Sequence, residues 1–229
     1  MYNGIMVLDE RENSILEFLV RDFIKTAEPV SSSRIRAGLC LKESPATIRN
    51  IVADLDEAGF LEQPHTSAGR VPTDLAYRYF VDNLMSDISL SREIFVRMKR
   101  ITARREEIGR FLSEALDVLS FTSFDGGHFD SHGFSNLFKE PEFKREDSVL
   151  DAGYFIDHVE DIADIYSKRL KKTAEIFIGR ENPVDCAREL GIFYVESDSR
   201  GRSQTTILVG PKRMNYERVS SYTNFFLDE

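Results

Sequence analysis

The chain has 229 residues, of which 41% are hydrophobic and 30% are charged, a composition that excludes a disordered protein. No stretch approaches 18 consecutive apolar residues, so we expect no membrane-spanning helix. The two cysteines, Cys40 and Cys186, provide neither a disulfide framework nor a zinc site, which favours a cytoplasmic protein. The net charge of −9 argues against a generic polyanion binder, although a sequence-specific DNA-binding protein can gather its basic groups on one face.

The first part of the chain predicts three helices followed by two short strands. Each helix starts at a capping residue and carries apolar residues at helical spacing, and the strands flank a turn-rich segment. The predicted helices and the strand–turn–strand segment cover residues 9–26, 31–38, 44–58 and 60–73. This order is typical of a winged helix-turn-helix, which we assign to a domain of residues 1–88. A small helical domain that binds only proteins has the same order of elements.

A seam of apolar residues follows, with spacings that alternate between four and three. Such spacing predicts one long helix with a coiled-coil seam, broken by the charged Arg105. We expect residues 89–122 to link the domains and to hold a homodimer, although a long helix packed on its own C-terminal domain has the same pattern. The expected dimerisation residues are Ile94, Met98, Ile101, Ile108, Leu112 and Leu119. Residues 92–110 contain seven basic and three acidic side chains, typical of a solvated face or of a surface near a phosphate backbone.

The remaining residues, 123–229, predict an α+β domain with about three strands. The region 122–147 contains several glycines and reads as a loop. One helix or a pair of helices is expected over 148–172, a terminal helix over 215–227 and a short helix over 183–190. The expected strands cover 174–178, 192–196 and 204–209. So small a sheet leaves apolar surface exposed unless a partner covers it, so we expect the isolated domain to be marginally stable. The residues expected to supply much of that surface are Phe177, Phe193, Tyr194, Phe225 and Phe226.

Catalytic and cofactor motifs are not found. The chain has no GxGxxG, no P-loop and no GxSxG, so we expect neither an enzyme nor a cofactor. His128, Asp130 and His132 would share a face of an extended strand, which leaves a divalent metal site as an alternative. A fourth ligand is not evident and the flanking glycines favour a loop, so we expect no metal.

Several segments carry a family resemblance. Residues 44–85, SPATIRNIVADLDEAGFLEQPHTSAGRVPTDLAYRYFVDNLM, closely resemble the heat-inducible transcription repressor family HrcA. NLFKEPEF (136–143), IFIGREN (176–182) and GPKRMNYERV (210–219) resemble further stretches of the same family. Between Phe121 and GGHFDSHG the chain departs from the family, whose members have a longer region there that includes an inserted dimerising piece. The resemblance therefore implies a truncated GAF-like sensor domain over residues 123–229.

The resemblance implies a function as well as a fold. Members of this bacterial family bind an inverted-repeat operator, called CIRCE, as dimers and repress heat-shock chaperone operons. The GroEL chaperonin keeps the repressor in its active form. The expected partners are therefore double-stranded DNA, a GroEL-type chaperonin and a second copy of the chain. A winged-helix module that binds only proteins is the alternative, and a metal- or ligand-dependent enzyme in the C-terminal half is a third hypothesis.

The candidate DNA-contacting residues follow from how a helix-turn-helix docks. The N-terminal residues of its second helix meet base edges, where Arg49 can pair with guanine and Asn50 with adenine. The alternative for Arg49 is a surface ion pair with Asp54 or Glu57. The full set of expected contacts is Arg34, Ser44, Ala46, Thr47, Arg49, Asn50, His65, Thr66, Ser67 and Arg70. Residues 1–85 carry nine basic and thirteen acidic side chains, a net charge of −4, so affinity for random DNA should be low.

Overall fold

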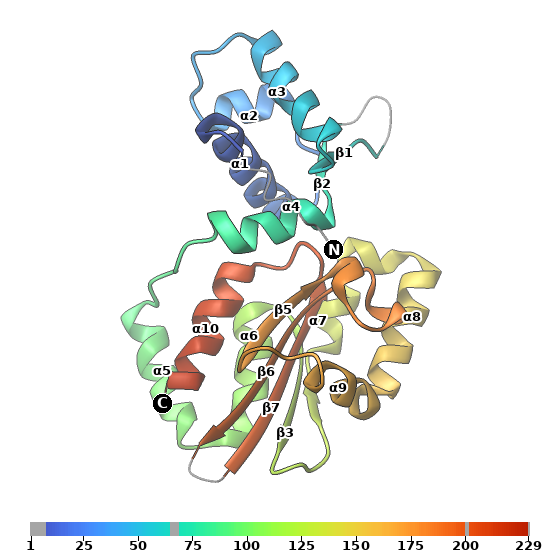
Figure 1. Cartoon of the computed structure of the whole chain (residues 1–229). Helices are drawn as coiled ribbons and strands as arrows, with labels where there is room; N and C mark the ends of the chain where they lie inside the picture. Colours follow the sequence, from blue (N-terminus) through green and yellow to red (C-terminus); the bar gives the residue numbers. More distant parts are fainter. Residues whose placement is uncertain (1–7, 65–68, 200–201, 229) are drawn as a thin grey trace. The chain divides into compact units, whose positions relative to one another are not determined.

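The computed structural model describes residues 8–64, 69–199 and 202–228 (Figure 1). The chain divides into two compact units, Met1–Met85 and Ser86–Glu229. This division falls three residues before the predicted domain boundary. It also places the predicted linker, residues 89–122, inside the second unit rather than between two domains.

The first unit contains three helices, a pair of short strands and a fourth helix, in the order that the sequence predicts. Its elements are α1 (Glu10–Thr26), α2 (Ser32–Gly38), α3 (Pro45–Glu57), β1 (Leu61–Glu62), β2 (Val71–Pro72), α4 (Asp74–Tyr79) and a π-helical turn (Phe80–Leu84). Asp9 caps α1 through the predicted capping box, because its carboxylate accepts from the Glu12 amide while the Glu12 carboxylate accepts from the Asp9 amide. The buried core includes Ile15, Leu16, Leu19, Ile35, Ile48, Leu55, Phe60 and Phe80.

An isolated bridge joins Arg70, just before β2, to Val30, which lies two residues before α2. The amide and carbonyl of Val30 exchange two hydrogen bonds of 2.9 Å with those of Arg70. The neighbouring Gly69 lies so close to this bridge that a Cβ placed on it would be 2.4 Å from the Val30 carbonyl carbon and oxygen. Only glycine fits at this position, because the obstacle is backbone that cannot move without breaking the bridge.

We predict that Gly69→Ala lowers the free energy of unfolding by about 1–3 kcal/mol, the usual cost of forcing an extra methyl group into packed structure. Hydrogen exchange should show the Arg70 and Val30 amides losing protection first. Gly153→Ala in helix α8 (Glu146–Asp157) is the matched control, since a Cβ there meets nothing within 4 Å and alanine favours the helix. Equal stability of the two variants would contradict the close approach.

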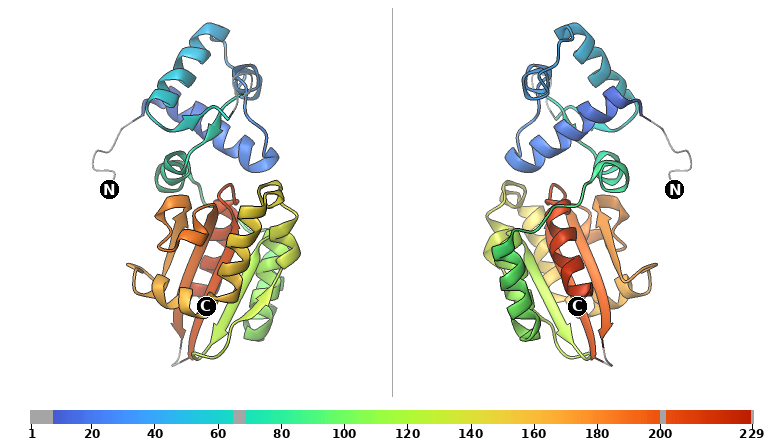
Figure 2. Two further views of the ribbon diagram at one scale, coloured as in Figure 1. Left: turned by 90° about the vertical axis from the view of Figure 1, so that its right-hand side faces the viewer. Right: turned by 90° about the vertical axis from the view of Figure 1, so that its left-hand side faces the viewer.

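The second unit is built on a five-stranded antiparallel sheet with the order β4-β3-β7-β6-β5 (Figures 1 and 2). The strands are β3 (Leu119–Phe124), β4 (Asp130–His132), β5 (Ala174–Ile178), β6 (Leu190–Ser199) and β7 (Arg202–Pro211). The helices are α5 (Arg92–Thr102), α6 (Ile108–Leu116), α7 (Phe134–Phe138), α8 (Glu146–Asp157), α9 (Val159–Ser167) and α10 (Tyr216–Asp228). Short 3-10 turns cover Arg105–Glu107, Pro141–Lys144, Gly179–Glu181 and Asp185–Ala187, the last where the short helix was predicted.

Helices cover both faces of this sheet (Figure 2). The register aligns Leu119, Val209, Ile192 and Phe177 in one row across four strands, and this face packs against side chains of α8 and α9. On the opposite face, the Ser120 hydroxyl donates 2.7 Å to the Gly109 carbonyl of α6. Helix α10 joins α6 on this side through Phe111, which stacks on Tyr222. The second unit is therefore a three-layer arrangement of helices, sheet and helices.

The prediction that apolar side chains of the sheet are exposed is wrong. Phe177, Phe193 and Tyr194 are buried, because the two helical layers and the extra strands cover them. The sheet has five strands rather than three, since the predicted loop at 122–147 contains the end of β3, all of β4 and α7. Asp125 and Gly126, with φ of 53° and 71°, turn β3 into β4.

The prediction of one long helix over residues 94–119 is also wrong. Helix α5 ends at Thr102, and Arg104 has the non-helical dihedrals φ −129° and ψ 73°. Arg105, the charged break in the seam, places its guanidinium over the Phe124 ring and donates to the Ser203 carbonyl, so the chain bends there. Helix α6 then ends before the left-handed Asp117, and the chain continues as strand β3.

The seam residues are used inside the chain instead. Met98, Ile101, Ile108, Leu112 and Leu119 are buried within the second unit, and Ile94 is partly buried. Apolar residues spaced alternately four and three residues apart indicate only that a helix has one buried side. It does not distinguish a partner helix from the protein's own sheet. The structure matches the alternative in which this segment packs on its own C-terminal domain.

Candidate nucleic-acid interface

Helix α3 presents one exposed stripe opposite its buried side. Ser44 caps the helix by accepting from the Thr47 amide at 3.1 Å, and Pro45 occupies the first turn. The side chains of Ile48, Val52 and Leu55 are buried, which fixes the rotation of the helix. The exposed side chains on the opposite side follow the spacing i, i+3, i+4, i+7 and are Ala46, Arg49, Asn50 and Ala53.

A groove with a volume of about 830 Å³ runs beside this stripe, between α2, α3 and the start of β2. Three arginines line it, namely Arg36 from α2, Arg49 from α3 and Arg70 next to β2. None of the described residues that line the groove is an aspartate or a glutamate. A concave surface with three guanidinium groups and no carboxylate favours a polyanion, in a unit whose net charge is negative.

The three arginines differ in how they are held. The Nε atom of Arg70 lies 2.6 Å from the Asp56 carboxylate, so its side chain is fixed against α3. Arg49 is exposed and has no hydrogen bond or ion pair to any described residue, which does not match the alternative of a pair with Asp54 or Glu57. Arg36 is likewise exposed and unpaired among the described residues. Arg36 and Arg49 are thus available to a ligand.

Of the two arginines on α2, the groove is lined by Arg36 and not by Arg34. Arg34, the predicted phosphate contact, pairs with Asp22 at 2.9 Å and with Glu28 at 3.3 Å, and it does not line the groove. Arg36 lines the groove but was not predicted as a contact. In the seven-residue α2 both arginines flank the buried Ile35, so periodicity alone does not show which one faces the groove. The predicted contacts His65, Thr66 and Ser67 lie outside the described residues.

The predicted alternative metal ligands are not brought together in the described part of the chain, which holds no group of three His, Cys, Asp or Glu side chains suited to a metal ion. Instead, the Nδ1 atom of His128 lies 2.7 Å from the Glu160 carboxylate on α9. This hydrogen bond and the charge of Glu160 raise the pKa of His128 above its ordinary value.

We predict that an NMR titration of His128 gives a pKa above 6.5, the value expected in the unfolded chain. Because the folded pKa is the higher one, the pair stabilises the fold fully below the unfolded pKa and ceases to do so as the pH rises through the folded pKa. Glu160→Gln should return the pKa of His128 toward its ordinary value. An identical titration in the two proteins would show that the pair does not form in solution.

Comparison with known proteins identifies the family. The family described as "HrcA protein C terminal domain" matches residues 78–219, more than half of the chain. The chain belongs to the HrcA family. The match covers most of the second unit, from the end of α4 to the first turn of α10.

Curated HrcA proteins are similar to part of the chain. It is 53% identical over 116 residues to the heat-inducible transcription repressor HrcA of Carboxydothermus hydrogenoformans, which covers 50% of this chain and 34% of that protein. It is 44% identical over 140 residues to the protein of the same name from Geobacter sulfurreducens, which covers 59% of this chain and 40% of that protein. The chain thus spans only about a third to two fifths of the length of these relatives.

A solved structure shares the fold. The crystal structure of a hypothetical protein superimposes with a TM-score of 0.80 at 17% identity, over 97% of both chains. In the part of this HrcA chain that the structure describes, no helix has both the length and the apolar character needed to cross a membrane.

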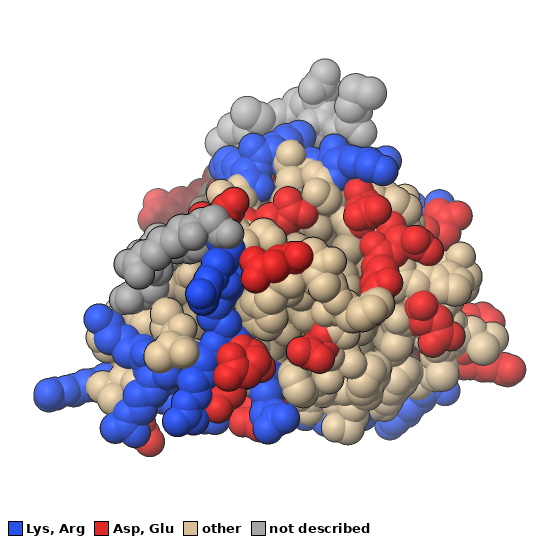
Figure 3. All heavy atoms as spheres, turned by 90° about the horizontal axis from the view of Figure 1, so that it is seen from below, with Lys and Arg blue, Asp and Glu red and all other residues tan. Residues whose placement is uncertain are grey.

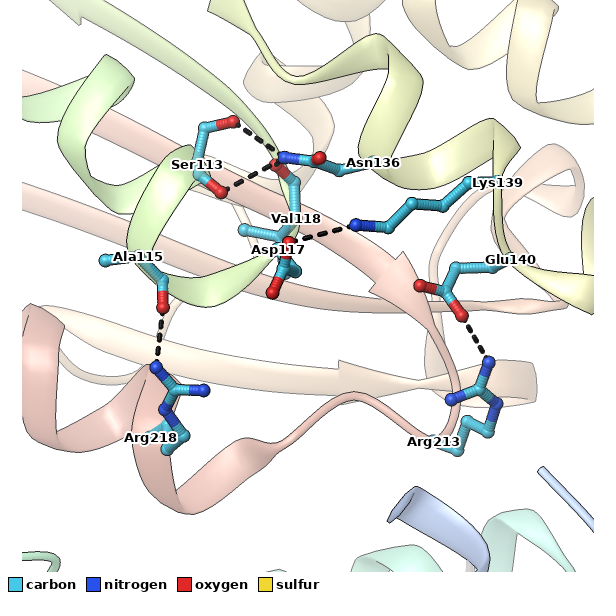
Figure 4. A network of polar contacts seen from close by, with 9 residues as sticks. All are labelled: Ser113, Ala115, Asp117, Val118, Asn136, Lys139, Glu140, Arg213 and Arg218. Atoms are coloured by element: carbon cyan, nitrogen blue, oxygen red, sulfur yellow. Dashed lines mark hydrogen bonds and ion pairs between the residues drawn. The ribbon is translucent and has the colours of Figure 1, made fainter. Parts of the chain in front are cut away.

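Two of the HrcA segments that the sequence singles out, NLFKEPEF (136–143) and GPKRMNYERV (210–219), meet in one polar network (Figure 4). Asn136 donates through its side-chain amide to the carbonyls of Ser113 and Val118, at 3.1 and 3.3 Å, and so holds the C-terminal end of α6. Arg218 donates 2.6 Å to the Ala115 carbonyl of the same helix end. The bond from Arg218 satisfies a carbonyl in the last turn of α6 that has no partner within the helix.

An arginine that is mostly removed from solvent joins the same two segments to each other. Arg213 pairs with Glu140 and Glu142, and its Nε atom lies 2.6 Å from the Glu142 carboxylate. Burial alone lowers the pKa of Arg213, but the hydrogen bonds and charges of the two carboxylates outweigh it and raise the pKa. The NLFKEPEF and GPKRMNYERV segments of this HrcA chain therefore act as structural connections around α6, a role that sequence resemblance alone does not reveal.

Proposed function

We propose that this chain is a DNA-binding transcription repressor of heat-shock genes and that its first unit is a winged helix-turn-helix. The observation that carries the proposal is the groove of Arg36, Arg49 and Arg70 beside the exposed stripe of α3, in a chain of the HrcA family. The curated relatives bear the name of heat-inducible transcription repressors. In this proposal α3 enters the major groove, and β1 and β2 form the base of the wing.

The roles of the contact residues follow from their chemistry. Arg49 donates two hydrogen bonds to a guanine, and Asn50 pairs with an adenine. The exposed Ala46 and Thr47 lie against thymine methyl groups, and the N-terminus of α3 at Ser44 favours a phosphate. Arg36 and Arg70 contact the sugar–phosphate backbone on either side of α3. Arg34 contributes only if a phosphate displaces its carboxylate partners. The remaining proposed contacts are His65, Thr66 and Ser67.

The target in this proposal is a CIRCE-type inverted repeat upstream of chaperone genes in the bacterial cytoplasm. An inverted repeat has two half-sites related by two-fold symmetry, which two copies of the chain match. Since five of the six predicted seam residues are buried within the chain, we propose that another surface of the second unit joins the homodimer. The second unit itself we interpret as a shortened GAF-like sensor domain.

A GroEL-type chaperonin is the proposed regulator, as the resemblance implies. Helix α8 supports this role, because its Leu150 and Tyr154 side chains are 64% and 56% exposed and Val149 lies beside them. Large apolar side chains left in water mark surfaces that bind other proteins. A chaperonin that binds such a surface would link repressor activity to the supply of free chaperonin.

The proposed function is tested by fluorescence anisotropy with the inverted repeat upstream of the host's own chaperone genes and a scrambled duplex of equal composition. We expect the repeat to bind about 10³-fold or more tightly than the scrambled duplex at physiological salt. Equal binding of both duplexes, or none, would contradict the proposal and favour a module that binds only proteins.

A further inference from the structure

A long basic stretch of the chain lies in the second unit. Residues 92–110, which form α5, the turn at Arg105–Glu107 and the start of α6, contain seven basic and three acidic residues. Residues 111–229 contain fourteen basic and twenty-two acidic residues. In Figure 3 the Lys and Arg side chains gather at one corner of the face shown, over α5 and the turn that follows it. We call residues 92–110 the basic edge.

Most cations of the basic edge are exposed, and several are not neutralised. Arg92, Arg100 and Arg110 are exposed and form no hydrogen bond or ion pair with any described residue. Arg97 and Arg104 pair with Glu114 and Glu107 at 3.1 and 3.0 Å, but their side chains are 53% and 67% exposed. Such exposed pairs contribute little to stability and can exchange one partner for another. Arg92, Arg100 and Arg110 therefore leave positive charge on the basic edge that no described carboxylate neutralises.

The scaffold beneath the basic edge is rigid. Met98 and Ile101 anchor α5 in the core of the second unit. Phe95 packs edge-on against Phe225 of α10, with ring centroids 5.3 Å apart. With this buried side fixed, Arg92 and Arg100 lie on the outer side of the helix, about 12 Å apart along its axis at 1.5 Å per residue. The charges are thus held in place rather than spread over a flexible tail.

We propose that the basic edge binds the phosphate backbone of double-stranded DNA, outside the base pairs that α3 reads. This inference rests on the proposed function, because DNA bound by the first unit is then tethered to the second. Only six residues, 86–91, separate the first unit from α5, so the basic edge follows a bound duplex at high effective concentration. The proposal also explains how a first unit with a net charge of −4 obtains a non-specific component of affinity.

An anionic membrane surface fits these observations less well. A helix that lies on a membrane has a wide apolar face that inserts beside its basic residues. Met98 and Ile101 of α5 are buried in the protein core, whereas Phe95 and Val96 are 41% and 43% exposed, and Phe95 packs against Phe225 of α10. Two partly exposed apolar side chains do not make a wide apolar face, so the exposed guanidinium groups beside them match phosphate contacts along a duplex.

The test compares the salt dependence of DNA binding in two matched triple variants of the full chain. Arg92→Gln/Arg100→Gln/Arg110→Gln removes three unpaired cations from the basic edge. Lys168→Gln/Lys171→Gln/Lys172→Gln removes three exposed cations after α9, which are also unpaired among the described residues. Anisotropy is measured with the inverted repeat and with the scrambled duplex, each with flanking DNA, from 50 to 300 mM salt. Thermal unfolding verifies that both variants are folded.

We expect the basic-edge variant to lose about two to three units from the slope of log K against log salt, since each phosphate contact contributes about 0.9. Its affinity at low salt should fall at least about tenfold for both duplexes, with their ratio unchanged, while the control keeps the slope of the unsubstituted chain. An unchanged slope in a variant that still prefers the repeat would overturn this inference and leave the proposed function intact. No duplex binding by the unsubstituted chain would overturn both. Loss of binding to phosphatidylserine vesicles, with an unchanged DNA slope, would assign the basic edge to lipid.

Discussion

Leu112→Glu is expected to unfold the second unit, with a loss of more than about 4 kcal/mol in the free energy of unfolding. Leu112 is only 1% exposed and lies on α6 between the sheet and α10. A glutamate there places a carboxylate in an apolar site without a partner, one of the most destabilising changes a single substitution makes. Urea denaturation followed by far-UV circular dichroism measures the effect.

The control is the same substitution on the surface. Leu150→Glu in α8 changes a side chain that is 64% exposed, so stability should change by no more than about 0.5 kcal/mol. The comparison also separates the two interpretations of the apolar seam. A coiled coil predicts that Leu112→Glu yields folded monomers, whereas the structure predicts loss of folding. Light scattering that shows a folded monomer of normal stability would contradict the structure.

Arg49→Ala is expected to weaken binding to the inverted repeat by about 1–3 kcal/mol per half-site and to relax the preference at one base pair of each. The reason is that the guanidinium of Arg49 is exposed at the groove, on the stripe of α3 that faces away from the core. Anisotropy with a panel of single-base variants of the repeat measures both effects. Loss of a base contact, unlike loss of a phosphate contact, changes the ranking of the duplexes.

Lys25→Ala is the matched control, because Lys25 is exposed on the last turn of α1 and does not line the groove. It removes the same charge from the first unit, so any difference between the variants reports the position of Arg49 rather than net charge. If Arg49→Ala and Lys25→Ala bind every duplex alike, the base-reading role belongs to another residue.

The first unit could be predicted closely from the sequence because its signals are local. The Asp9 capping box, the Ser44 cap followed by Pro45, and Gly59 after α3 each determine an element boundary within a few residues. The groove could be predicted only in part. Of the arginines predicted to contact DNA, Arg49 and Arg70 line the groove and Arg34 does not. Arg36, which was not predicted as a contact, lines it instead, because the rotation of the short α2 depends on tertiary packing.

The second unit shows what local signals leave undetermined. The strand β5 was recognisable by alternation, and β6 and β7 by the turn between them. The sheet also needs β3, whose residues from Leu119 to Phe124 are buried nearly throughout and do not alternate. The break after α5 depends on Arg105 stacking on Phe124, a contact between residues far apart in the helical pattern. The turn between β3 and β4 had a usable signal, since Asp-Gly is a strong hairpin sequence.

The tip of that hairpin is a suitable site for inserting additional residues. The Gly127 amide donates 2.9 Å to the Phe124 carbonyl, so the two strands lie one hydrogen bond apart at an exposed tip, and a Cβ on Gly126 would meet nothing within 4 Å. Exposed tips with closely spaced ends accept inserted sequence at small entropic cost. A fluorescent peptide inserted between Gly126 and Gly127 would give a reporter on the second unit. The insertion point is far in sequence from the residues of α3 whose binding the reporter would follow.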